Sequence, residues 1–364
     1  MKKEWIYIAG PECFYTGGTE MLAAMRKRAE SQGFGVTLPN DHPLDMSSSD
    51  LRKHADSIFE DLKVDMLDTT VIIADLEAYR GSEPDSGTVY ELGMAYAKGA
   101  KCYGYTRDKR PLAWKDQKYV LRDKIVYDEH GKEAPYKELP FAPCIIGSTK
   151  IVEGDFDDCL QMLRQDLEEE EKAKGMRGYK EAVKEAPAKE KDHGEMPVVY
   201  LAGPERYEKD AAEIYDRMKK LCADLGLKAI APIDWAEGIE PLETDSSYAA
   251  AANLFDNYQQ HVRDCDAVIA NLNDYRGYEC SNDVGFECGM GFQLGKKLYG
   301  YMDDAGFMKD RVPHLGEEEG FRDMTGANVE NFDYPLNLMF SCSMDIHEGK
   351  FEDMIRKVAE DLKK

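Results

Sequence analysis

The sequence predicts an α/β protein built from two doubly wound domains, each with a parallel β-sheet. The first observation is an internal repeat: IYIAGPE at 6–12 returns as VYLAGPE at 199–205, VIIADL at 71–76 as AVIANL at 267–272, and YELGM at 90–94 as FECGM at 286–290. The second is that short apolar strands alternate with amphipathic helices, a pattern typical of parallel sheets covered on both faces. The third is the length, because 364 residues suffice for two domains with separate cores.

The elements follow in the same order in both halves. Apolar runs predict strands at residues 6–9, 36–38, 71–75 and 101–105, with a further short strand near 150–152. The periodicity predicts helices at 19–32, 51–67, 86–98 and 156–172. In the second half we expect strands at 198–202, 228–231, 267–271 and 297–301, with a last strand near 343–347. Ligands of such sheets bind beyond the carboxyl ends of the strands, so we expect the site in the loops that follow them.

A charged segment separates the repeats. We place repeat 1 at 1–167, the linker at 168–196 and repeat 2 at 197–364. The linker is rich in Glu, Lys and Ala, and Pro187 and Pro197 punctuate it. It is either a tether that sets the geometry between the domains or an extension of the last helix followed by a solvated connection.

The composition narrows the class of partner and the compartment. A formal net charge of −24 argues against nucleic acid or an anionic membrane surface as partner. No apolar run approaches the span of a bilayer, and Met1-Lys2-Lys3 leads into a strand rather than a signal peptide. The nine cysteines form no CxxC pair and no metal-ligand spacing. We therefore expect reduced thiols, a cytoplasmic protein and no metal site.

The sharpest segment for chemistry is PDSGTVYE at residues 84–91. Pro84 and Asp85 predict a helix start, and Gly87 allows a ligand or side chain to approach the backbone closely. Thr88 and Glu91 fit a capping box, with Asp85 as the N-cap, which gives the segment a purely structural interpretation. Alternatively, a buried carboxylate at this position could attack an electrophilic sugar carbon.

Several other residues could face the same cleft. Tyr7 lies in the first strand just before Gly10, and a phenol there is either core or the partner that orients a carboxylate. Its copy is Tyr200. Asp61 on the second helix, or its rival Asp65, is either a solvated helical residue or part of the site.

Late in each repeat a loop carries a position that differs between the copies. YPLNLM at 334–339 contains Asn337, whereas LPFAPC at 139–144 has Ala142 in register. An Asn in such a loop is either a turn former or a ligand-binding residue.

Together these segments resemble the nucleoside 2-deoxyribosyltransferase family. The resemblance rests on YIAGP at the start, the AVIA strand at 267–270, YRG at 79–81, PDSGT followed by Glu91, and the late Asn337-Leu338-Met339. It implies a flavodoxin-like fold and a double displacement with retained configuration, in which Glu91 attacks C1′ of a 2′-deoxynucleoside and a second base completes the transfer. It also implies that Tyr7 orients Glu91, that Asp85 binds the sugar hydroxyl, and that Asp61 is the acid that exchanges the proton with the base.

The same resemblance implies which residues surround the substrate. Gly10, Ser86, Gly87 and Met339 would contact it, and no metal or organic cofactor is needed. Because the family's late Asn completes a neighbouring subunit's site, the two repeats would form a pseudo-dimer in which Asn337 completes the site of repeat 1.

The second copy lacks two of these groups. Ala142 stands for the Asn, and Ser281 stands opposite Asp85, with Asp283 too close to Glu287. We therefore expect one competent site per chain and a degenerate site at Tyr200, Asn257 and Glu287.

Two other functions stay open at this stage. A hydrolase of nucleosides or nucleoside monophosphates would use water as acceptor, with Ser86 and Thr88 at a helix N-terminus cradling a 5′-phosphate. A non-catalytic nucleotide-binding module is the other alternative. The expected partners are nucleosides and free nucleobases in nucleotide salvage, and further copies of the chain in a homo-oligomer. The loops at 38–41 and 232–235, including Trp235, leave the base preference undetermined.

Overall fold

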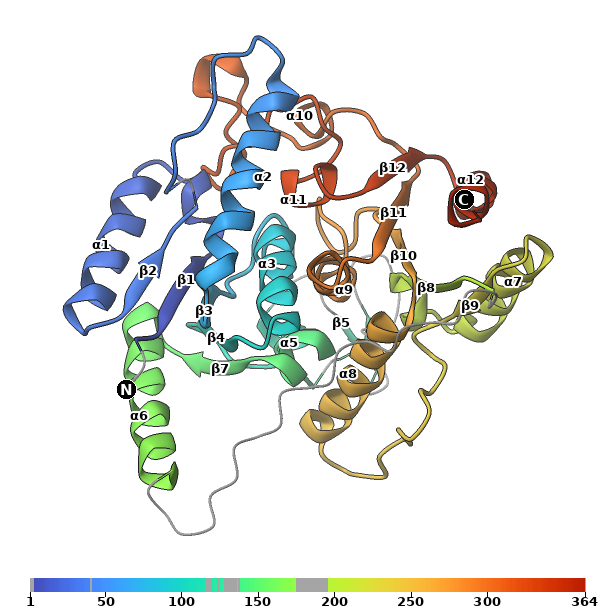
Figure 1. Ribbon diagram of the computed structural model, residues 1–364, viewed down its shortest axis with the longest axis horizontal. Helices are drawn as coiled ribbons and strands as arrows, with labels where there is room; N and C mark the ends of the chain where they lie inside the picture. The colour runs from blue at the N-terminus through green and yellow to red at the C-terminus, as the bar shows by residue number, and fades with distance from the viewer. Residues whose placement is uncertain are drawn as a thin grey trace.

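The computed structural model describes residues 3–39, 41–115, 120–122, 125–127, 136, 138–174 and 196–363. Two five-stranded parallel sheets have the same strand order, β2-β1-β3-β4-β7 in repeat 1 and β9-β8-β10-β11-β12 in repeat 2. Both sheets are doubly wound, with helices on each face (Figure 1). The predicted fold class, two flavodoxin-like domains, is confirmed.

Repeat 1 follows the predicted order of elements. Its sheet consists of β1 Trp5–Ala9, β2 Gly35–Thr37, β3 Val71–Asp75, β4 Lys101–Thr106 and β7 Lys150–Glu153. Its main helices are α1 Gly18–Ser31, α2 Leu51–Asp68, α3 Ser86–Ala97 and α6 Phe156–Lys174. Because α6 continues to Lys174, the first residues of the predicted linker are helical, and 175–195 lie outside the described residues. The repeat and linker boundaries stay predictions.

Repeat 2 has the same plan. Its sheet consists of β8 Val198–Ala202, β9 Lys228–Ile230, β10 Ala267–Asn271, β11 Lys297–Met302 and β12 Asp345–Glu348. Its main helices are α7 Ala211–Asp224, α8 Ser247–Asp264, α9 Asn282–Gln293 and α12 Phe351–Leu362. The last strand, β12, starts two residues later than the predicted strand at 343–347.

Short elements connect these in both halves. They are the 3-10 helices η1 Pro11–Phe14, η2 Pro204–Tyr207 and η3 Glu317–Glu319, the hairpin strands β5 Val120–Arg122 and β6 Ile125–Tyr127, and the helices α4 Leu112–Lys115, α5 Pro143–Ser148, α10 Met308–Arg311 and α11 Leu338–Ser341. Among the described helices, none is both long and apolar enough to cross a bilayer.

The two repeats meet along α3 and α9, which lie side by side between the sheets (Figure 1). Gly93 and Gly289 permit the close approach, because a Cβ at either position would collide with a backbone carbonyl oxygen of the opposite helix. The helix starts are capped across the interface. Glu279 accepts a hydrogen bond from the Ser86 amide at 2.7 Å, and Glu83 accepts one from the Asn282 amide at 3.1 Å.

The apolar core is arranged in three layers. One outer layer lies between the first sheet and α1 and α6, and another lies between the second sheet and α7 and α12. The middle layer is continuous through both repeats and includes Tyr7, Phe59, Tyr200 and Phe286. Since side chains alternate along a strand, Ile6 and Ile8 face the outer layer while Tyr7 faces the middle one. The pseudo-dimer interface is therefore a hydrophobic core rather than a surface contact.

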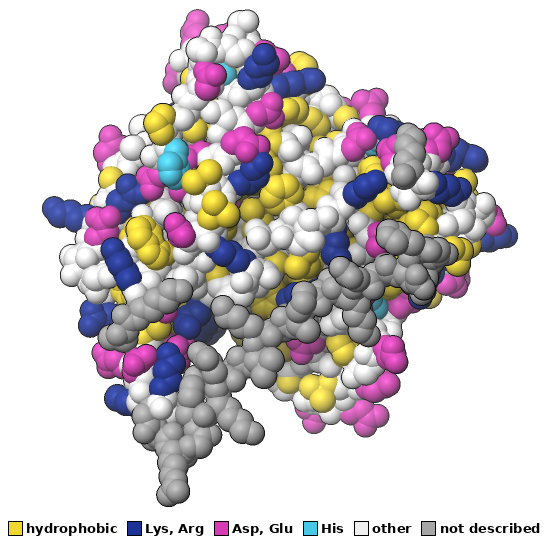
Figure 2. All heavy atoms as spheres, in the orientation of Figure 1, with side chains coloured by type: hydrophobic (Ala, Val, Ile, Leu, Met, Phe, Trp, Pro, Cys, Tyr) yellow, Lys and Arg dark blue, Asp and Glu magenta, His cyan; other side chains and the backbone are white. Residues whose placement is uncertain are grey.

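The segment 303–334 of repeat 2 crosses over to repeat 1. Asn328 donates its amide proton to the Phe14 carbonyl oxygen at 2.7 Å, and Asp323 pairs with Arg80 at 2.9 Å. On the face shown in Figure 2, charged side chains of both signs surround apolar side chains gathered near the middle. The crossing segment brings residues of repeat 2 to the carboxyl end of β1, where the sequence predicts the site.

Candidate active site

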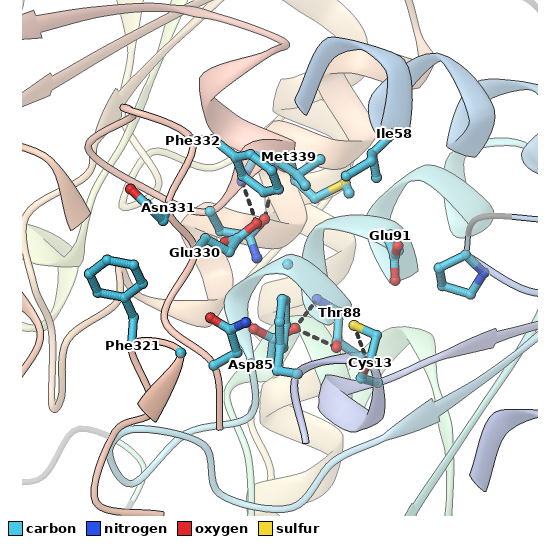
Figure 3. Close-up of a pocket in the computed structure, with 18 residues that line it drawn as sticks. Cys13, Ile58, Asp85, Thr88, Glu91, Phe321, Glu330, Asn331, Phe332 and Met339 are labelled. Atoms are coloured by element: carbon cyan, nitrogen blue, oxygen red, sulfur yellow. Dashed lines mark hydrogen bonds between the residues drawn. The ribbon is translucent and has the colours of Figure 1, made fainter. Parts of the chain in front are cut away.

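A cavity of about 450 Å³ lies beside the first turns of α3 and is lined by both repeats. Repeat 1 contributes Gly10, Cys13, Phe14, Pro39, Ile58, Asp85, Gly87, Thr88 and Glu91. Repeat 2 contributes Gly320, Phe321, Asn328, Glu330, Asn331, Phe332, Asn337, Leu338 and Met339. Figure 3 shows Glu91 at one side of this cavity, with Phe321 and Asn331 at the other. Of the described residues that line it, three are acidic and none is basic.

Glu91 is a buried carboxyl held by a buried phenol. The Tyr7 hydroxyl donates to Glu91 Oε1 at 2.6 Å. Burial raises the pKa of Glu91 to about 8, and the nearby Asp85 and Asp65 carboxyls add to the rise, while the Tyr7 hydrogen bond opposes it. The side chain is 6% exposed, so a ligand in the cavity would meet a carboxyl with little competing water.

Asp85 caps α3 and keeps one oxygen unpartnered. Its Oδ2 accepts from the Thr88 amide at 2.7 Å and from the Thr88 hydroxyl at 2.6 Å. Its Oδ1 is buried without a hydrogen-bond partner. Burial raises the pKa of this carboxyl, and the Thr88 bonds oppose the rise. The structural and functional interpretations of Asp85 are thus compatible, since one oxygen caps the helix and the other has no hydrogen-bond partner.

Asn337 reaches the same helix start from repeat 2. Its Oδ1 caps α11 by accepting from the Met339 amide at 2.9 Å. A Cβ at Gly87 would lie 2.6 Å from the Asn337 amide nitrogen. Gly87 is therefore required for the close approach of this side chain to α3.

Asp61 and Asp65 are buried on α2 and do not line the cavity. The His42 Nδ1 lies 2.5 Å from Asp61 Oδ1 and 3.5 Å from Asp65 Oδ1. Burial, together with the neighbouring Asp61, raises the pKa of Asp65 to about 7. Ligand atoms of these three residues lie within 4.8 Å of one another, so this trio could hold a metal ion.

The second copy of the site has a different chemistry. The Tyr200 hydroxyl donates to Glu287 Oε1 at 2.7 Å, as Tyr7 does to Glu91. Arg206 also binds both Glu287 oxygens, each at 2.7 Å, and its guanidinium lies over the Tyr258 ring. Arg206 stands in register with Cys13 of repeat 1. Glu287 is thus a bidentate partner of a buried cation rather than a bare carboxyl.

The other residues of the second copy have structural partners. Asp283 accepts from the Tyr207 hydroxyl and from the Cys144 amide. Ser281, opposite Asp85, makes no side-chain cap bond. Asn257 accepts from the Ala236 amide at 2.8 Å and donates to backbone carbonyls of the loop before α8. Trp235 in that loop is exposed.

Comparison with known proteins identifies the chain. The model of the family described as nucleoside 2-deoxyribosyltransferase matches residues 6–142 and 199–339. The chain belongs to the nucleoside 2-deoxyribosyltransferase family. Because both halves match, the predicted tandem duplication is confirmed.

Individual relatives are distant. An uncharacterized protein of Schizosaccharomyces pombe is 28% identical over 118 residues, which are 32% of this chain and 55% of that protein, so the chain spans about half the length of this curated relative. A 2-desoxiribosyltransferase from Leishmania mexicana is 27% identical, with 45% of this chain and 97% of that chain covered and a TM-score of 0.36. A 2-deoxyribosyltransferase from Bacillus psychrosaccharolyticus is 18% identical, with 43% and 90% covered and a TM-score of 0.28.

The structure brings together most of the residues that the resemblance to this family singled out. The predicted residues that line the cavity are Gly10, Asp85, Gly87, Glu91, Asn337 and Met339. Tyr7 lies directly behind Glu91. Ser86 and Asp61 do not line it: Ser86 is buried with its amide bound to Glu279, and only Ile58 represents α2 in the lining.

Sequence reasoning missed the residues of the crossing segment, above all Glu330 and Phe321, and it missed Arg206 in the second copy. The segment 303–334 has no strong periodicity, so the sequence carries no signal for where it lies. Arg206 could have been found, because placing Cys13 and Arg206 in register shows a new cation beside the second carboxylate.

Proposed function

We propose that this member of the nucleoside 2-deoxyribosyltransferase family transfers 2-deoxyribose between nucleobases at one active site per chain, with Glu91 as nucleophile. The single observation that carries the proposal is the buried Glu91 carboxyl, held by Tyr7 at 2.6 Å, on the wall of a cavity that Asp85 and Asn337 share. A carboxylate with few hydrogen-bond donors around it is a better nucleophile than a solvated one.

The proposed reaction is a double displacement. A Glu91 oxygen bonds to C1′ of the deoxynucleoside, the C1′–N bond breaks, and its electron pair leaves with the base, which takes up a proton. The nitrogen of a second base then bonds to C1′ from the opposite face, releases a proton and expels the Glu91 carboxylate. Two inversions retain the configuration at C1′. Tyr7 occupies Oε1 of Glu91, so the attacking oxygen is the other one.

Asp61 is our candidate for the acid that protonates the departing base, and Asp65 is the alternative. Asp61 is hydrogen-bonded to His42, whereas both oxygens of Asp65 are buried and accept no hydrogen bond. The pKa of Asp65, raised to about 7, suits proton transfer at neutral pH. Because the lining includes only Ile58 of α2, these carboxyls could act directly only after a local movement of that wall.

The apolar part of the cavity favours transfer over hydrolysis. Phe14, Phe321, Phe332, Ile58 and Met339 line it together with the polar groups. Such walls suit the flat faces of a nucleobase and leave little room for ordered water near the ester. A base acceptor is therefore better accommodated than a water acceptor.

The test is base exchange. The protein is incubated with a 2′-deoxynucleoside and a different free base, and the products are separated by chromatography. We expect the new deoxynucleoside to form, Glu91→Ala to abolish it, and Glu287→Ala to retain it.

Three outcomes would contradict the proposal. Release of free deoxyribose without dependence on the acceptor base would indicate a hydrolase. Binding without turnover across a panel of nucleosides would indicate a binding module. Loss of activity in Glu287→Ala with retention in Glu91→Ala would place the active site in repeat 2.

A further inference from the structure

His42, Asp61 and Asp65 form a compact group where the loop before α2 meets that helix. Asp61 and Asp65 are one helical turn apart on α2, and their side chains are 2% and 0% exposed. His42 lies on the loop, and half of its side chain is exposed. Candidate ligand atoms of the three residues lie within 4.8 Å of one another. The group is therefore closed by the protein around the aspartates and open to solvent at the imidazole.

Three carboxylate oxygens of this group accept no hydrogen bond from the described residues. Asp61 Oδ1 accepts from the His42 amide at 3.1 Å and lies 2.5 Å from His42 Nδ1. Asp61 Oδ2 and both oxygens of Asp65 are buried without a hydrogen-bond partner, and Asp65 Oδ1 points into the group, 3.5 Å from His42 Nδ1. The nearby Arg26 pairs with Asp41 instead. Buried acceptors that no donor reaches are costly, so three of them in one place indicate a ligand that brings positive charge.

The same two helix positions in repeat 2 carry residues that find donors and acceptors in the protein. Helices α2 and α8 both contain 18 residues, so Asn257 stands in register with Asp61, and His261 with Asp65. Asn257 Nδ2 donates to the Asp234 carbonyl oxygen at 2.7 Å, and His261 Nε2 lies 2.9 Å from the same oxygen. An ionised carboxylate cannot donate to a carbonyl oxygen. The unpartnered oxygens are therefore a property of repeat 1 and are not imposed by the shared fold.

We propose that His42, Asp61 and Asp65 bind one divalent cation of the first transition row, with Zn²⁺ as its representative. Zn²⁺ accepts imidazole nitrogen and carboxylate oxygen at about 2.0–2.2 Å, so two such ligands at neighbouring corners of a tetrahedron lie about 3.4 Å apart. The 3.5 Å between His42 Nδ1 and Asp65 Oδ1 matches this separation. Asp61 supplies the third ligand, and the fourth position is left to water on the exposed side of the imidazole. Mg²⁺, which favours octahedral oxygen ligands and retains its water, fits this set poorly.

The ion binds ionised carboxylates and a neutral imidazole. It therefore displaces the proton from His42 Nδ1 and any proton that Asp65 carries, and these protons go to solvent. Binding is tighter when the ligands are already deprotonated, so about pH 8 is the appropriate condition for measuring it.

The position of the group gives the ion an effect on the cavity. Pro39 lies on the loop that carries His42, and it lines the cavity. Ile58, labelled in Figure 3, also lines it and shares a face of α2 with Asp61 and Asp65. A bound ion would tie the loop to α2 and hold these two walls together. The inference goes beyond the proposed function and does not require it. In base exchange the ion would keep both aspartates from giving a proton to the base, so it would act as an inhibitor and not as a cofactor.

The experiment is a calorimetric titration of the full chain with Zn²⁺ at about pH 8, after removal of bound metal with a chelator, together with thermal unfolding. We expect one ion to bind per chain and to raise Tm, since an ion that binds only the folded protein stabilises it. His42→Gln and Asp65→Asn each remove one ligand and should weaken binding by at least about tenfold. His54→Gln is the matched control: this histidine on α2 bonds the Ser48 carbonyl oxygen at 2.7 Å, outside the group, and the variant should bind Zn²⁺ as the wild type does.

Three results would overturn the inference. The first is a wild-type protein that does not bind Zn²⁺ under these conditions. The second is binding that stays unchanged in His42→Gln and Asp65→Asn, with circular dichroism showing both variants folded, because the ion would then lie elsewhere, such as on cysteine thiols. The third is an equal rise of Tm with Mg²⁺ at the same concentration, which would indicate only an unspecific attraction of cations to acidic groups. Since the His42 side chain is half-exposed on a loop, His42→Gln tests the site without disturbing the core.

Discussion

At the scale of single residues, Arg206 in place of Cys13 changes the surroundings of the buried glutamate between the two copies. Both copies keep a tyrosine that donates to a buried glutamate, at 2.6 Å in repeat 1 and 2.7 Å in repeat 2. Cys13 adds no charge beside the first glutamate, whereas Arg206 binds both oxygens of the second. Burial raises the pKa of both glutamates, but a buried arginine opposes that rise only at Glu287.

The hydrogen bond from Tyr7 should control both the rate and its pH dependence. Since Glu91 attacks as the carboxylate and its pKa is about 8, kcat/KM for base exchange should rise with pH and level off above that value. Tyr7→Phe removes a bond to a charged group, so we expect a loss of roughly 10- to 100-fold and a shift of the rising limb to higher pH. Tyr103→Phe, which removes a bond to Asp166 outside the site, should change neither. An unshifted limb in Tyr7→Phe would contradict the assigned role.

The two glutamates should respond oppositely to the same substitution. Glu287→Gln leaves the buried Arg206 without its counter-charge and should lower the free energy of unfolding by about 3–5 kcal/mol. Glu91→Gln removes a carboxyl that burial disfavours in its charged form, so stability should be unchanged or higher at neutral pH. Thermal unfolding of the two variants and the wild type measures this. Equal effects on Tm would show that the pairing with Arg206 contributes little.

Some site residues could be predicted from the sequence and others could not, depending on how far apart they lie along the chain. Glu91, Asp85 and Gly87 are close in sequence on one helix start, so their joint placement follows from local structure. Asn337 required the repeat to be recognised, because it comes from the other half. Glu330 lies in a long connection without periodicity, and only the folded chain shows that this segment crosses to repeat 1.

At the scale of elements, the regular strands and helices were predictable and the connections were not. The central strands are apolar runs bounded by turns, and β3 and β10 match their predicted ranges. The four-residue helices and the β5–β6 hairpin are too short to leave a periodic pattern. Their positions depend on packing against the other repeat.

The crossing of α3 and α9 depends on glycine at the contact. A Cβ at Gly289 would collide with the Tyr90 carbonyl oxygen, which belongs to the backbone and cannot turn aside. Gly289→Ala should therefore lower the free energy of unfolding by about 2 kcal/mol or more, and it should reduce activity by displacing α3. Gly285→Ala is the graded control, because its Cβ would lie 3.2 Å from the Ser86 carbonyl oxygen. If Gly289→Ala is no more destabilising than Gly285→Ala, the helices are less tightly packed than described.

At the scale of the whole molecule, the site exists because the two repeats share one core. The middle apolar layer is continuous through both halves, and each repeat caps the other's central helix with a glutamate. Repeat 2 has replaced its own bare carboxyl by an ion pair, yet it supplies Asn337 and Glu330 to the cavity of repeat 1. The two copies thus differ in what surrounds the buried glutamate, and repeat 2 also lines the cavity of repeat 1.

Many carboxyls of the folded protein have a raised pKa because they are buried, and this should make the protein less stable as pH rises. The groups whose pKa is raised to about 7 or 8 are Asp65, Asp75, Glu83, Glu91, Glu279 and Glu330. Unfolded carboxyls titrate near about pH 4, so at neutral pH the unfolded chain has released protons that the folded protein keeps. Folding then takes up protons, and the free energy of unfolding decreases with pH, by up to about 1.4 kcal/mol per pH unit for each such group.

Thermal unfolding from about pH 5.5 to about pH 8.5 at constant ionic strength therefore should show a steadily decreasing Tm. Glu91→Gln and Glu330→Gln each remove one titrating carboxyl without changing its shape, so each should flatten the decrease. Glu318→Gln removes an exposed carboxyl and should leave the slope as it is. A Tm that stays level or rises over this range would mean that these carboxyls are already ionised in the folded protein. In that case Glu91 would be available as a nucleophile at lower pH than its burial implies, and the rising limb of the base-exchange profile would move down with it.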